Sequence, residues 1–411
     1  MFEMKLKDFK DLDAADPLRE KRDLFSIPEG VIYLDGISLG VLPNATPDAM
    51  NDMLQRQWGQ DLIRSWNKNE WINAPCRIGD KIGRLIGAAE GQVVAADSTS
   101  INVFKSLSAA SKINFGRKIL LSETGNFPTD PYMMEGLATA TGNQMLVELV
   151  NPSQIPDRLA PDVAVLLLTQ TNYKSGKVWD MAEITHLAHE AGVLVIWDLS
   201  HSTGAIQGEL DKCRVDFAVG CGYKFLNGGP GAPAYIYVAE RHQSKIIPVL
   251  SGWMGHESPF SFNDIYAPGK GIKRFLCGTP SILGLCALEI GVNIFQSVDM
   301  GVLRTKSRHL GDLFISLVKE NRMDFELASP REANMRGSQV SIRHQGGYSI
   351  MQALIDRGVI GDFRAPDIMR FGFTPLYTRY IDVWNAVSIL ADIMNSNYWR
   401  DEKYAVKTEV T

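Results

Sequence analysis

One lysine of the chain lies between a short apolar run and a glycine-rich turn. Residues 220–231 read GCGYKFLNGGPG, and the lysine is Lys224. Desolvation lowers the pKa of a lysine amine, and the neutral amine can condense with an aldehyde to form a Schiff base. Pyridoxal phosphate is the aldehyde cofactor that requires such a lysine. The pattern predicts a cofactor-bound lysine, although a lysine beside a turn is by itself more often an ordinary loop residue.

An aspartate upstream has the type and spacing to serve the same cofactor. Asp198 ends the strand-like run LVIWD at residues 194–198, and 224 − 198 = 26 residues separate it from Lys224. This separation fits the ends of two neighbouring strands. Because the ring nitrogen of pyridoxal phosphate must stay protonated, an acid is needed beside it. We therefore predict that Asp198 holds the ring nitrogen.

A third group of residues could bind the phosphate of the cofactor. Thr99 and Ser100 directly precede an apolar helix predicted over residues 101–113. Their hydroxyl groups and the unpaired amides of a helix start are suitable phosphate ligands, although such a motif is usually only a helix cap. The chain has no Gly-x-Gly-x-x-Gly after an early strand and no Walker-type Gly-Lys-Ser/Thr. This argues against a dinucleotide or nucleotide site.

The composition is typical of a globular enzyme. The 411 residues imply two or more domains, and 45% of them are hydrophobic while 22% are charged. The net charge of −5 and the lack of a basic cluster interleaved with aromatics argue against nucleic acid as a partner. Residues 1–23 are rich in charge, and no later segment approaches 18 uninterrupted apolar residues. We therefore expect a cytoplasmic protein that binds small molecules and no membrane.

The cysteines predict neither disulfides nor a metal site. They form no Cys-x-x-Cys pair and no Cys/His cluster, so reduced thiols are expected. Cys221 lies three residues before Lys224 and could be a nucleophile, but a small buried strand residue is the simpler interpretation. The five are Cys76, Cys213, Cys221, Cys277 and Cys286.

The middle of the chain alternates apolar runs of strand length with helical patterns. This alternation predicts a mostly parallel sheet with flanking helices. One helix is predicted over residues 181–191, and we expect its His186 and His189 to lie at the surface. The predicted strands are residues 118–121, 144–150, 163–168, 194–197, 217–220 and 234–238.

The pattern changes after a long polar stretch at residues 251–280. Long helices are predicted at 282–298 and 303–320, short strands around 325–327 and 339–342, and a last helix at 382–395. They predict a smaller α+β domain. The predicted domains are an N-terminal arm that joins the small domain (1–45), a large cofactor-binding domain (46–285) and the C-terminal small domain (286–411).

Six motifs in order give the chain a family resemblance. From about Leu24 to Tyr380 it resembles kynureninase, in its bacterial form. The resemblance implies a fold-type I enzyme whose large domain holds a mostly parallel seven-stranded sheet, with pyridoxal phosphate as cofactor and a homodimer that shares its active sites. The motifs are YLDG (33–36), SLG (38–40), NFPTD (126–130), WDLSHS (197–202), GYKFLNGGPG (222–231) and RFGF (370–373).

The resemblance also implies a role for each matching residue. Lys224 forms the Schiff base, Asp198 holds the ring nitrogen, and Arg370 grips the substrate carboxylate. The run at 366–369 before Arg370 reads as a loop that would aim it into a cleft. The other implied contacts are Phe127 stacked on the ring, Asp130 and His201 flanking it, Thr169 beside the cofactor, and the phosphate surrounded by Thr99, Ser100, Tyr223 and Trp253 and Thr279 of the opposing subunit.

The implied activity is hydrolysis of L-kynurenine to anthranilate and L-alanine, by cleavage of the bond between the β- and γ-carbons. Lys224 would act as the general base at the α-carbon, and Tyr223 is the candidate proton relay. The pair Gly278-Thr279 resembles the bacterial form, which favours kynurenine, while 3-hydroxykynurenine remains an alternative substrate. Trp66 is a candidate for contacting the aryl ring.

One position departs from the family motif. The family reads YLDGNSLG where this chain has Ile37 in place of the asparagine. An apolar side chain there either alters the substrate pocket, which makes Ile37 a candidate substrate contact, or reflects drift in a competent enzyme.

Two other functions stay open. The first is another fold-type I enzyme, such as an aminotransferase, a carbon–sulfur lyase or a cysteine desulfurase. A desulfurase needs a cysteine on a mobile loop, whereas the last cysteine, Cys286, lies in a helical apolar pattern. The second is a protein that binds pyridoxal phosphate without turnover.

Overall fold

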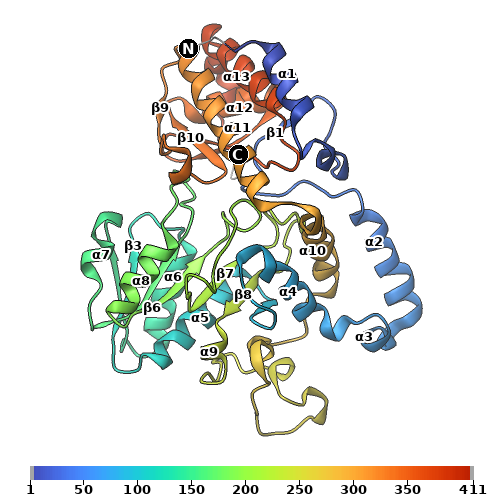
Figure 1. Cartoon of the computed structure of the whole chain (residues 1–411), viewed down its shortest axis with the longest axis vertical. Helices are drawn as coiled ribbons and strands as arrows, with labels where there is room; N and C mark the ends of the chain where they lie inside the picture. Colours follow the sequence, from blue (N-terminus) through green and yellow to red (C-terminus); the bar gives the residue numbers. More distant parts are fainter. Residues whose placement is uncertain (1–3, 408–411) are drawn as a thin grey trace.

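The chain folds into two lobes, the smaller of which lies above the larger in the view of Figure 1. A computed structural model describes residues 4–407. The larger lobe is built on a seven-stranded sheet, and the smaller lobe is built on a four-stranded sheet. The predicted α/β architecture with a mostly parallel seven-stranded sheet is confirmed.

The large sheet has the strand order β2-β8-β7-β6-β5-β3-β4. Every pair from β7 to β4 is parallel, whereas β8 runs antiparallel to both of its neighbours. The six predicted strands are present, and the sequence reading missed β2. The strands are β2 (Val93–Ala95), β3 (Ile119–Glu123), β4 (Leu146–Val150), β5 (Val163–Thr169), β6 (Leu194–Asp198), β7 (Phe217–Gly220) and β8 (Tyr235–Val238).

Helices cover both faces of this sheet because its inner strands are apolar on both sides. In β5, Leu166 and Leu168 pack into one core, and Val165 and Leu167 pack into the other. This alternation is the two-residue period of a strand. The first core is closed by α4 (Ala74–Ile86), α8 (Met181–Glu190) and α10 (Ile282–Ile294), and the second by α5 (Thr99–Ile113) and α6 (Thr129–Ala140).

The small lobe holds an antiparallel sheet with the order β12-β13-β10-β9. Phe9 and Leu34 of the N-terminal segment are buried in its core, so the beginning of the chain packs with its end. The elements are α1 (Leu6–Ala15), β1 (Ile32–Tyr33), α11 (Met300–Glu320), β9 (Glu326–Leu327), β10 (Gln339–Arg343), α12 (Gly347–Asp356), β11 (Val359–Ile360), β12 (Asp362–Arg364), β13 (Ile368–Gly372) and α13 (Tyr380–Asn395).

The predicted domain boundary at residue 285 falls inside α10. Glu289 of this helix forms ion pairs with Arg77 and Lys81 of α4, at 2.9 and 2.6 Å. Helix α10 is therefore tied to the large lobe. We propose that the small lobe begins with α11.

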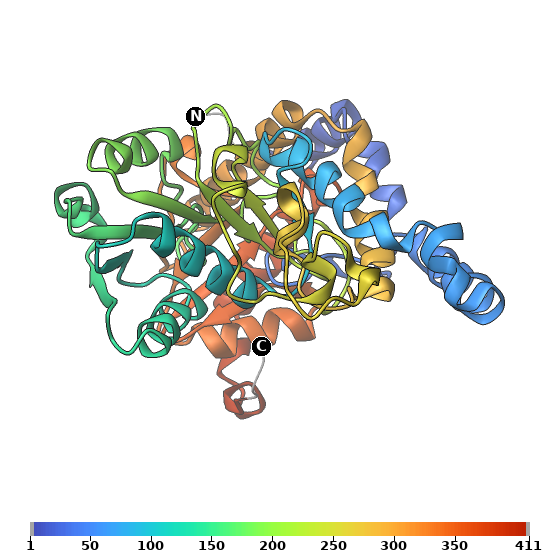
Figure 2. The same ribbon diagram turned by 90° about the horizontal axis from the view of Figure 1, so that it is seen from below.

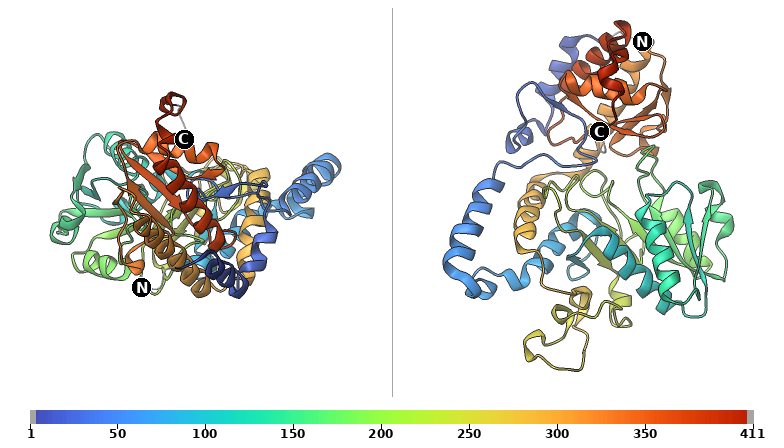
Figure 3. Two further views of the ribbon diagram at one scale, coloured as in Figure 1. Left: turned by 90° about the horizontal axis from the view of Figure 1, so that it is seen from above. Right: turned by 180° about the vertical axis from the view of Figure 1, so that it is seen from behind.

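A helical arm projects from the side of the molecule (Figures 2 and 3). It comprises α2 (Thr46–Asp52), a π-helical segment (Met53–Asp61) and α3 (Ser65–Lys68). Trp58, Leu62 and Ile63 on this arm are exposed. Within residues 4–407 no single helix is long and apolar enough to cross a membrane, and one bent pair, Ile282–Ser297 with Met300–Glu320, passes by length and composition only.

Candidate functional site

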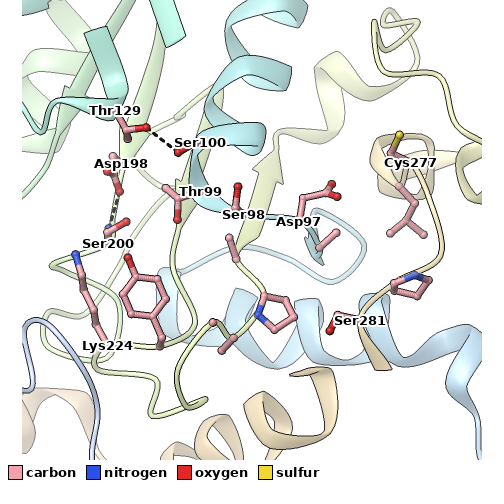
Figure 4. Close-up of a pocket in the computed structure, with 18 of the residues that line it drawn as sticks. Asp97, Ser98, Thr99, Ser100, Thr129, Asp198, Ser200, Lys224, Cys277 and Ser281 are labelled. Carbon is pink, nitrogen blue, oxygen red and sulfur yellow. Dashed lines mark hydrogen bonds between the residues drawn. The ribbon is translucent and has the colours of Figure 1, made fainter. Parts of the chain in front are cut away.

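The predicted residues converge at the carboxyl edge of the large sheet. Strands β5 and β6 end there, and the loop after β7 carries Lys224 to the same place. A cavity of about 500 Å³ opens at this edge (Figure 4). Eight of the predicted site residues line it: Thr99, Ser100, Phe127, Asp198, His201, Tyr223, Lys224 and Thr279.

Lys224 is a buried amine with few polar neighbours. Its Nζ lies 3.4 Å from Nε2 and 3.5 Å from Nδ1 of His201. Burial lowers the pKa of Lys224. Burial also lowers the pKa of His201 well below its ordinary value, and the charge of Lys224 acts in the same direction. The histidine is therefore neutral beside an amine that is biased toward its nucleophilic form.

The loop that carries Lys224 is held against the N-terminal segment. The amide of Gly40 donates to the carbonyl of Tyr223 at 2.8 Å. A Cβ on Gly40 would lie 2.4 Å from the carbonyl oxygen of Lys224, so only glycine allows this approach. The Ser38-Leu39-Gly40 motif thus positions the lysine turn.

Two buried carboxyl groups lie below the cavity. Asp198 Oδ1 accepts from the amide of Ser200 at 2.7 Å, and Asp130 Oδ2 accepts from Thr169 Oγ1 at 3.2 Å. Asp130 Oδ1 is buried and lacks a hydrogen-bond partner in the described part of the chain. Burial raises the pKa of both aspartates, and the charge of Asp198 adds to the shift of Asp130. The negative charge that these two carboxyl groups can carry is therefore not fully compensated by the described residues.

The opposite wall of the cavity is the start of helix α5. Thr99 and Ser100 are its first residues, and Ser100 Oγ lies 2.7 Å from Thr129 Oγ1 (Figure 4). The first amides of a helix have no partner within it and attract anions. The neighbouring Asp97 forms an ion pair with the buried Lys105, which offsets its negative charge. This wall suits a phosphate group.

Phe127 and Tyr173 form an aromatic pair at the rim. Their ring centroids are 5.2 Å apart and the rings are perpendicular. Phe127 is 38% exposed and lines the cavity. The Nζ of Lys224 is 5.7 Å from its ring centre. A flat ring bound to the lysine can therefore stack on Phe127.

Arg370 lies in the middle of strand β13, so the predicted loop before it is present only at residues 366–367, which form a turn. Residues 368–372 continue the small-lobe sheet because Ile368, Met369 and Phe371 are apolar and buried. The Arg370 guanidinium pairs with Asp362 of β12 and donates to Ser38 Oγ at 3.2 Å. The guanidinium of Arg370 is thus fixed in place, and the carboxylate of Asp362 already lies beside it.

Three other predicted contacts, Trp253, Trp66 and Ile37, do not line this cavity. Thr279 lies on the wall of this chain's own cavity, although the sequence predicted it for the partner's site. Trp253 is 40% exposed and packs edge-on against Phe260, and Trp66 packs against Trp71 on the projecting arm. Ile37 is buried in a small apolar cluster with Ala205 and Phe225. Its methyl groups lie against Gly372.

Pyridoxal phosphate fits this arrangement. The buried amine can bind an aldehyde, and a cationic ring nitrogen against Asp198 would supply the charge that the buried acids lack. The start of α5 offers donors to the phosphate, and the exposed Phe127 accommodates the ring. Cys221 is buried, which raises its pKa, so it is a packed thiol rather than a nucleophile.

Sequence reasoning missed several supporting residues. Ser200 follows Asp198 by two positions, and the short aspartate turn could have revealed it. Asn126 accepts from Thr169 Oγ1 at 2.5 Å and from the Phe127 amide at 2.7 Å, and it stood within a quoted motif without a role. Asp362 had no local signal, because only the pairing of β12 with β13 brings it to Arg370.

Comparison with known proteins relates the chain to one family. The kynureninase C-terminal domain family matches residues 303–390. Kynureninase of Burkholderia pseudomallei (strain 1106a) is 45% identical over 407 residues, which cover 97% of this chain and 98% of that protein. Kynureninase of Pseudomonas fluorescens is 46% identical with the same coverage.

Two solved structures share the fold at low identity. The cysteine desulfurase CsdA from Escherichia coli matches with a TM-score of 0.78 and 18% identity, over 92% of this chain and 98% of that one. A C-DES mutant with glycine covalently linked to its pyridoxal phosphate cofactor matches with a TM-score of 0.77 and 15% identity, over 90% and 99% of the two chains. These two structures support the fold-type I architecture.

Proposed function

Because the chain belongs to the kynureninase family, it is a pyridoxal-phosphate-dependent hydrolase that converts L-kynurenine to anthranilate and L-alanine, and we propose how its residues divide this work. The observation that carries the assignment is the buried amine of Lys224, which faces the same cavity as Asp198 and the start of α5.

Lys224 binds the cofactor and then acts as the general base. Once the substrate amine has taken its place, Nζ is free to accept the α-proton, and its lowered pKa favours the neutral form that this step requires. Pyridoxal phosphate held at Lys224 would supply an electron sink for the pair left at the α-carbon. Asp198 keeps the proton on the ring nitrogen, and the neutral His201 adds no competing positive charge.

Tyr223 is the proposed proton relay at the γ-carbonyl. Its ring centre lies 5.8 Å from Lys224 Nζ, and burial raises its pKa, so the phenol stays protonated at neutral pH. A protonated phenol can donate to the departing aryl fragment. A Tyr223→Phe enzyme that binds cofactor but keeps near-normal turnover would refute this role.

Arg370 is the proposed anchor for the substrate carboxylate. The residue is 1% exposed, and its guanidinium is held by strand β13 and by Asp362. The planar fork of an arginine suits a carboxylate, and firm placement sets the α-carbon relative to Lys224.

One experiment tests the whole assignment. The holoenzyme is incubated with L-kynurenine, and in parallel with 3-hydroxykynurenine, while anthranilate fluorescence and alanine are measured. We expect both products in equal amounts, borohydride trapping of the cofactor on Lys224, and loss of both signals in Lys224→Ala. An aminotransferase would leave the bond between the β- and γ-carbons intact, so the keto acid of kynurenine without anthranilate or alanine would indicate that activity. A yellow but inert protein would indicate binding without turnover.

We also propose that the enzyme is a cytoplasmic homodimer. Exposed apolar side chains on two segments support an interface between copies of the chain. They are Trp58, Leu62 and Ile63 on the arm, and Phe260 and Phe262 in the stretch at residues 251–280. Light scattering of the purified holoenzyme would give its mass, and a monomer at micromolar concentration would contradict the dimer.

A further inference from the structure

One loop of the large lobe reaches across to the small lobe. We call residues 171–179, between β5 and α8, the bridge segment. The amide of Gly337 donates to the Gly176 carbonyl at 2.7 Å, and Ser329 Oγ donates to the Ser175 carbonyl at 2.6 Å. The bridge segment is thus hydrogen-bonded to the small lobe over several residues.

The same segment is anchored in the large lobe at its far end. The amide of Trp179 donates to the Gln170 carbonyl at 2.9 Å, and its indole Nε1 donates to Glu123 Oε2 at 3.2 Å. Glu123 ends strand β3, four residues before Phe127. The ends of the bridge segment, at Thr171 and Trp179, are therefore fixed in the large lobe, and its middle, at Ser175 and Gly176, is bonded to the small lobe.

Tyr173 lies within the bridge segment and contacts both halves of the active site. Its carbonyl oxygen accepts from Arg370 Nη1 at 2.8 Å and from Gln339 Nε2 at 3.2 Å. Its ring packs perpendicular to Phe127, with centroids 5.2 Å apart, and the residue is 8% exposed. One residue thus joins the small-lobe arginine to the aromatic ring on the large lobe.

We propose that Tyr173 is a positioning residue that fixes Arg370 and Phe127 relative to each other, and through them the substrate carboxylate relative to the cofactor ring. The proposal rests on the proposed function, which assigns the carboxylate to Arg370 and the ring to Phe127. Those two anchors come from different lobes, so their separation depends on contacts that cross between the lobes.

The hydrogen bonds of Arg370 explain why this contact matters. Asp362 and Ser38, its other two partners in the described residues, belong to the small-lobe sheet and to the N-terminal segment. Tyr173 is the partner from the bridge segment. A reaction of this kind depends on placing the α-carbon over the cofactor, and an error of about 1 Å can cost roughly 100-fold in rate.

The test removes the ring contact of Tyr173 with Phe127 and leaves the carbonyl contact with Arg370 in place. Tyr173→Leu removes the aromatic pair and keeps the backbone carbonyl, while Tyr173→Phe keeps the ring. Cofactor dissociation constants come from absorbance titration of the apoenzyme, KM and kcat from anthranilate release, and thermal unfolding checks that each variant folds. We expect Tyr173→Leu to weaken cofactor binding about three- to tenfold and to raise KM by a similar factor. Tyr173→Phe should stay within about twofold of wild type.

A double variant tests the coupling. In an Arg370→Lys background, where the bidentate fork is lost, we expect Tyr173→Leu to change KM by less than about twofold while its effect on cofactor binding persists. Equal effects of Tyr173→Leu on KM in both backgrounds, or unchanged cofactor affinity and KM in the single variant, would overturn the proposal. An Arg370→Lys enzyme with normal KM would instead refute the assignment of Arg370, and a Phe127→Leu enzyme with normal cofactor affinity would refute that of Phe127.

Discussion

Two buried aspartates at opposite ends of the same pair of strands have opposite electrostatic surroundings. Asp198 ends β6, and Asp216 directly precedes the parallel strand β7. Asp216 accepts from His189 and His242, each at 2.8 Å, and pairs with Arg241 at 2.7 Å. Asp198 has its described hydrogen bond from the Ser200 amide.

The pKa values of the two carboxyl groups diverge accordingly. Burial would raise the pKa of Asp216, but hydrogen bonds from His189 and His242 outweigh it and lower the pKa. Burial raises the pKa of Asp198, and the bond from Ser200 offsets only part of that shift. At the carboxyl edge of the sheet, Asp198 is therefore available to pair with a cationic group of a ligand. At the amino edge, side chains of the protein itself pair with Asp216. The difference separates a functional site from a structural ion-pair network.

The largest expected effect comes from Asp198→Asn. We expect turnover to fall by roughly 1,000-fold, because an amide cannot hold a proton on the ring nitrogen of the cofactor. The Schiff base at Lys224 should still form, so the variant should remain coloured. Steady-state anthranilate release measures the loss, and turnover within tenfold of wild type would remove Asp198 from the proposed mechanism.

Asp216→Asn is the matched change at the other edge. It should lower the free energy of unfolding by about 2–4 kcal/mol, because it removes the buried carboxylate that accepts hydrogen bonds from His189, His242 and Arg241. The kcat of the folded fraction should stay near wild type. Urea unfolding and steady-state kinetics on the same preparation measure both quantities. A large fall in kcat with unchanged stability would mean that the amino edge is not purely structural.

Glu123 extends the comparison of the two edges to the pH dependence of the free energy of unfolding. It lies at the carboxyl edge, and burial raises its pKa from 4.5 to about 7. The folded protein therefore holds a proton on Glu123 that the unfolded chain releases, so the free energy of unfolding falls as pH rises from about 4.5 to 7. At about 1.36 kcal/mol per pKa unit, the full decrease is roughly 3–3.5 kcal/mol.

Glu123→Gln should remove this decrease and make the protein more stable than wild type at pH 8. Unfolding by urea at pH 5 and at pH 8 measures the change. Asp216 has the opposite effect on the pH dependence of stability. Because its pKa is lowered in the folded protein, its contribution to the free energy of unfolding is lost as pH falls below about 4. Parallel pH profiles for wild type and Glu123→Gln would mean that Glu123 does not titrate in this range.

The sequence predicted more of the residues that meet at the carboxyl edge of the sheet than of those that meet at the amino edge. Lys224 and Asp198 were identifiable because cofactor chemistry demands those residue types at strand ends. His186 and His189 were expected at the surface; His186 is exposed, whereas His189 is only partly exposed because its Nε2 binds the buried Asp216. A helical face alone does not reveal a partner 27 residues away, just before strand β7.

Contacts between distant segments were likewise beyond sequence reasoning. Strand β2 was missed because three apolar residues before a helix have no period to recognise. Arg370 was found, but its strand and its pairing with Asp362 follow from the antiparallel register of β12 and β13. The contact of Tyr173 with Phe127 joins two loops of the large lobe, and no local pattern encodes it.

The smallest expected effect concerns the phosphate end of the carboxyl edge. Ser100→Ala removes one hydroxyl from the start of α5 and its contact with Thr129, so the cofactor dissociation constant should rise about five- to tenfold. Ser108→Ala is the matched control, because Ser108 lies on the same helix and bonds within it, to the Phe104 carbonyl at 2.7 Å. Absorbance titration of both apoenzymes separates the two. If they lost cofactor affinity equally, the effect would come from the helix rather than from a phosphate contact, and the carboxyl edge would lose its proposed anion site.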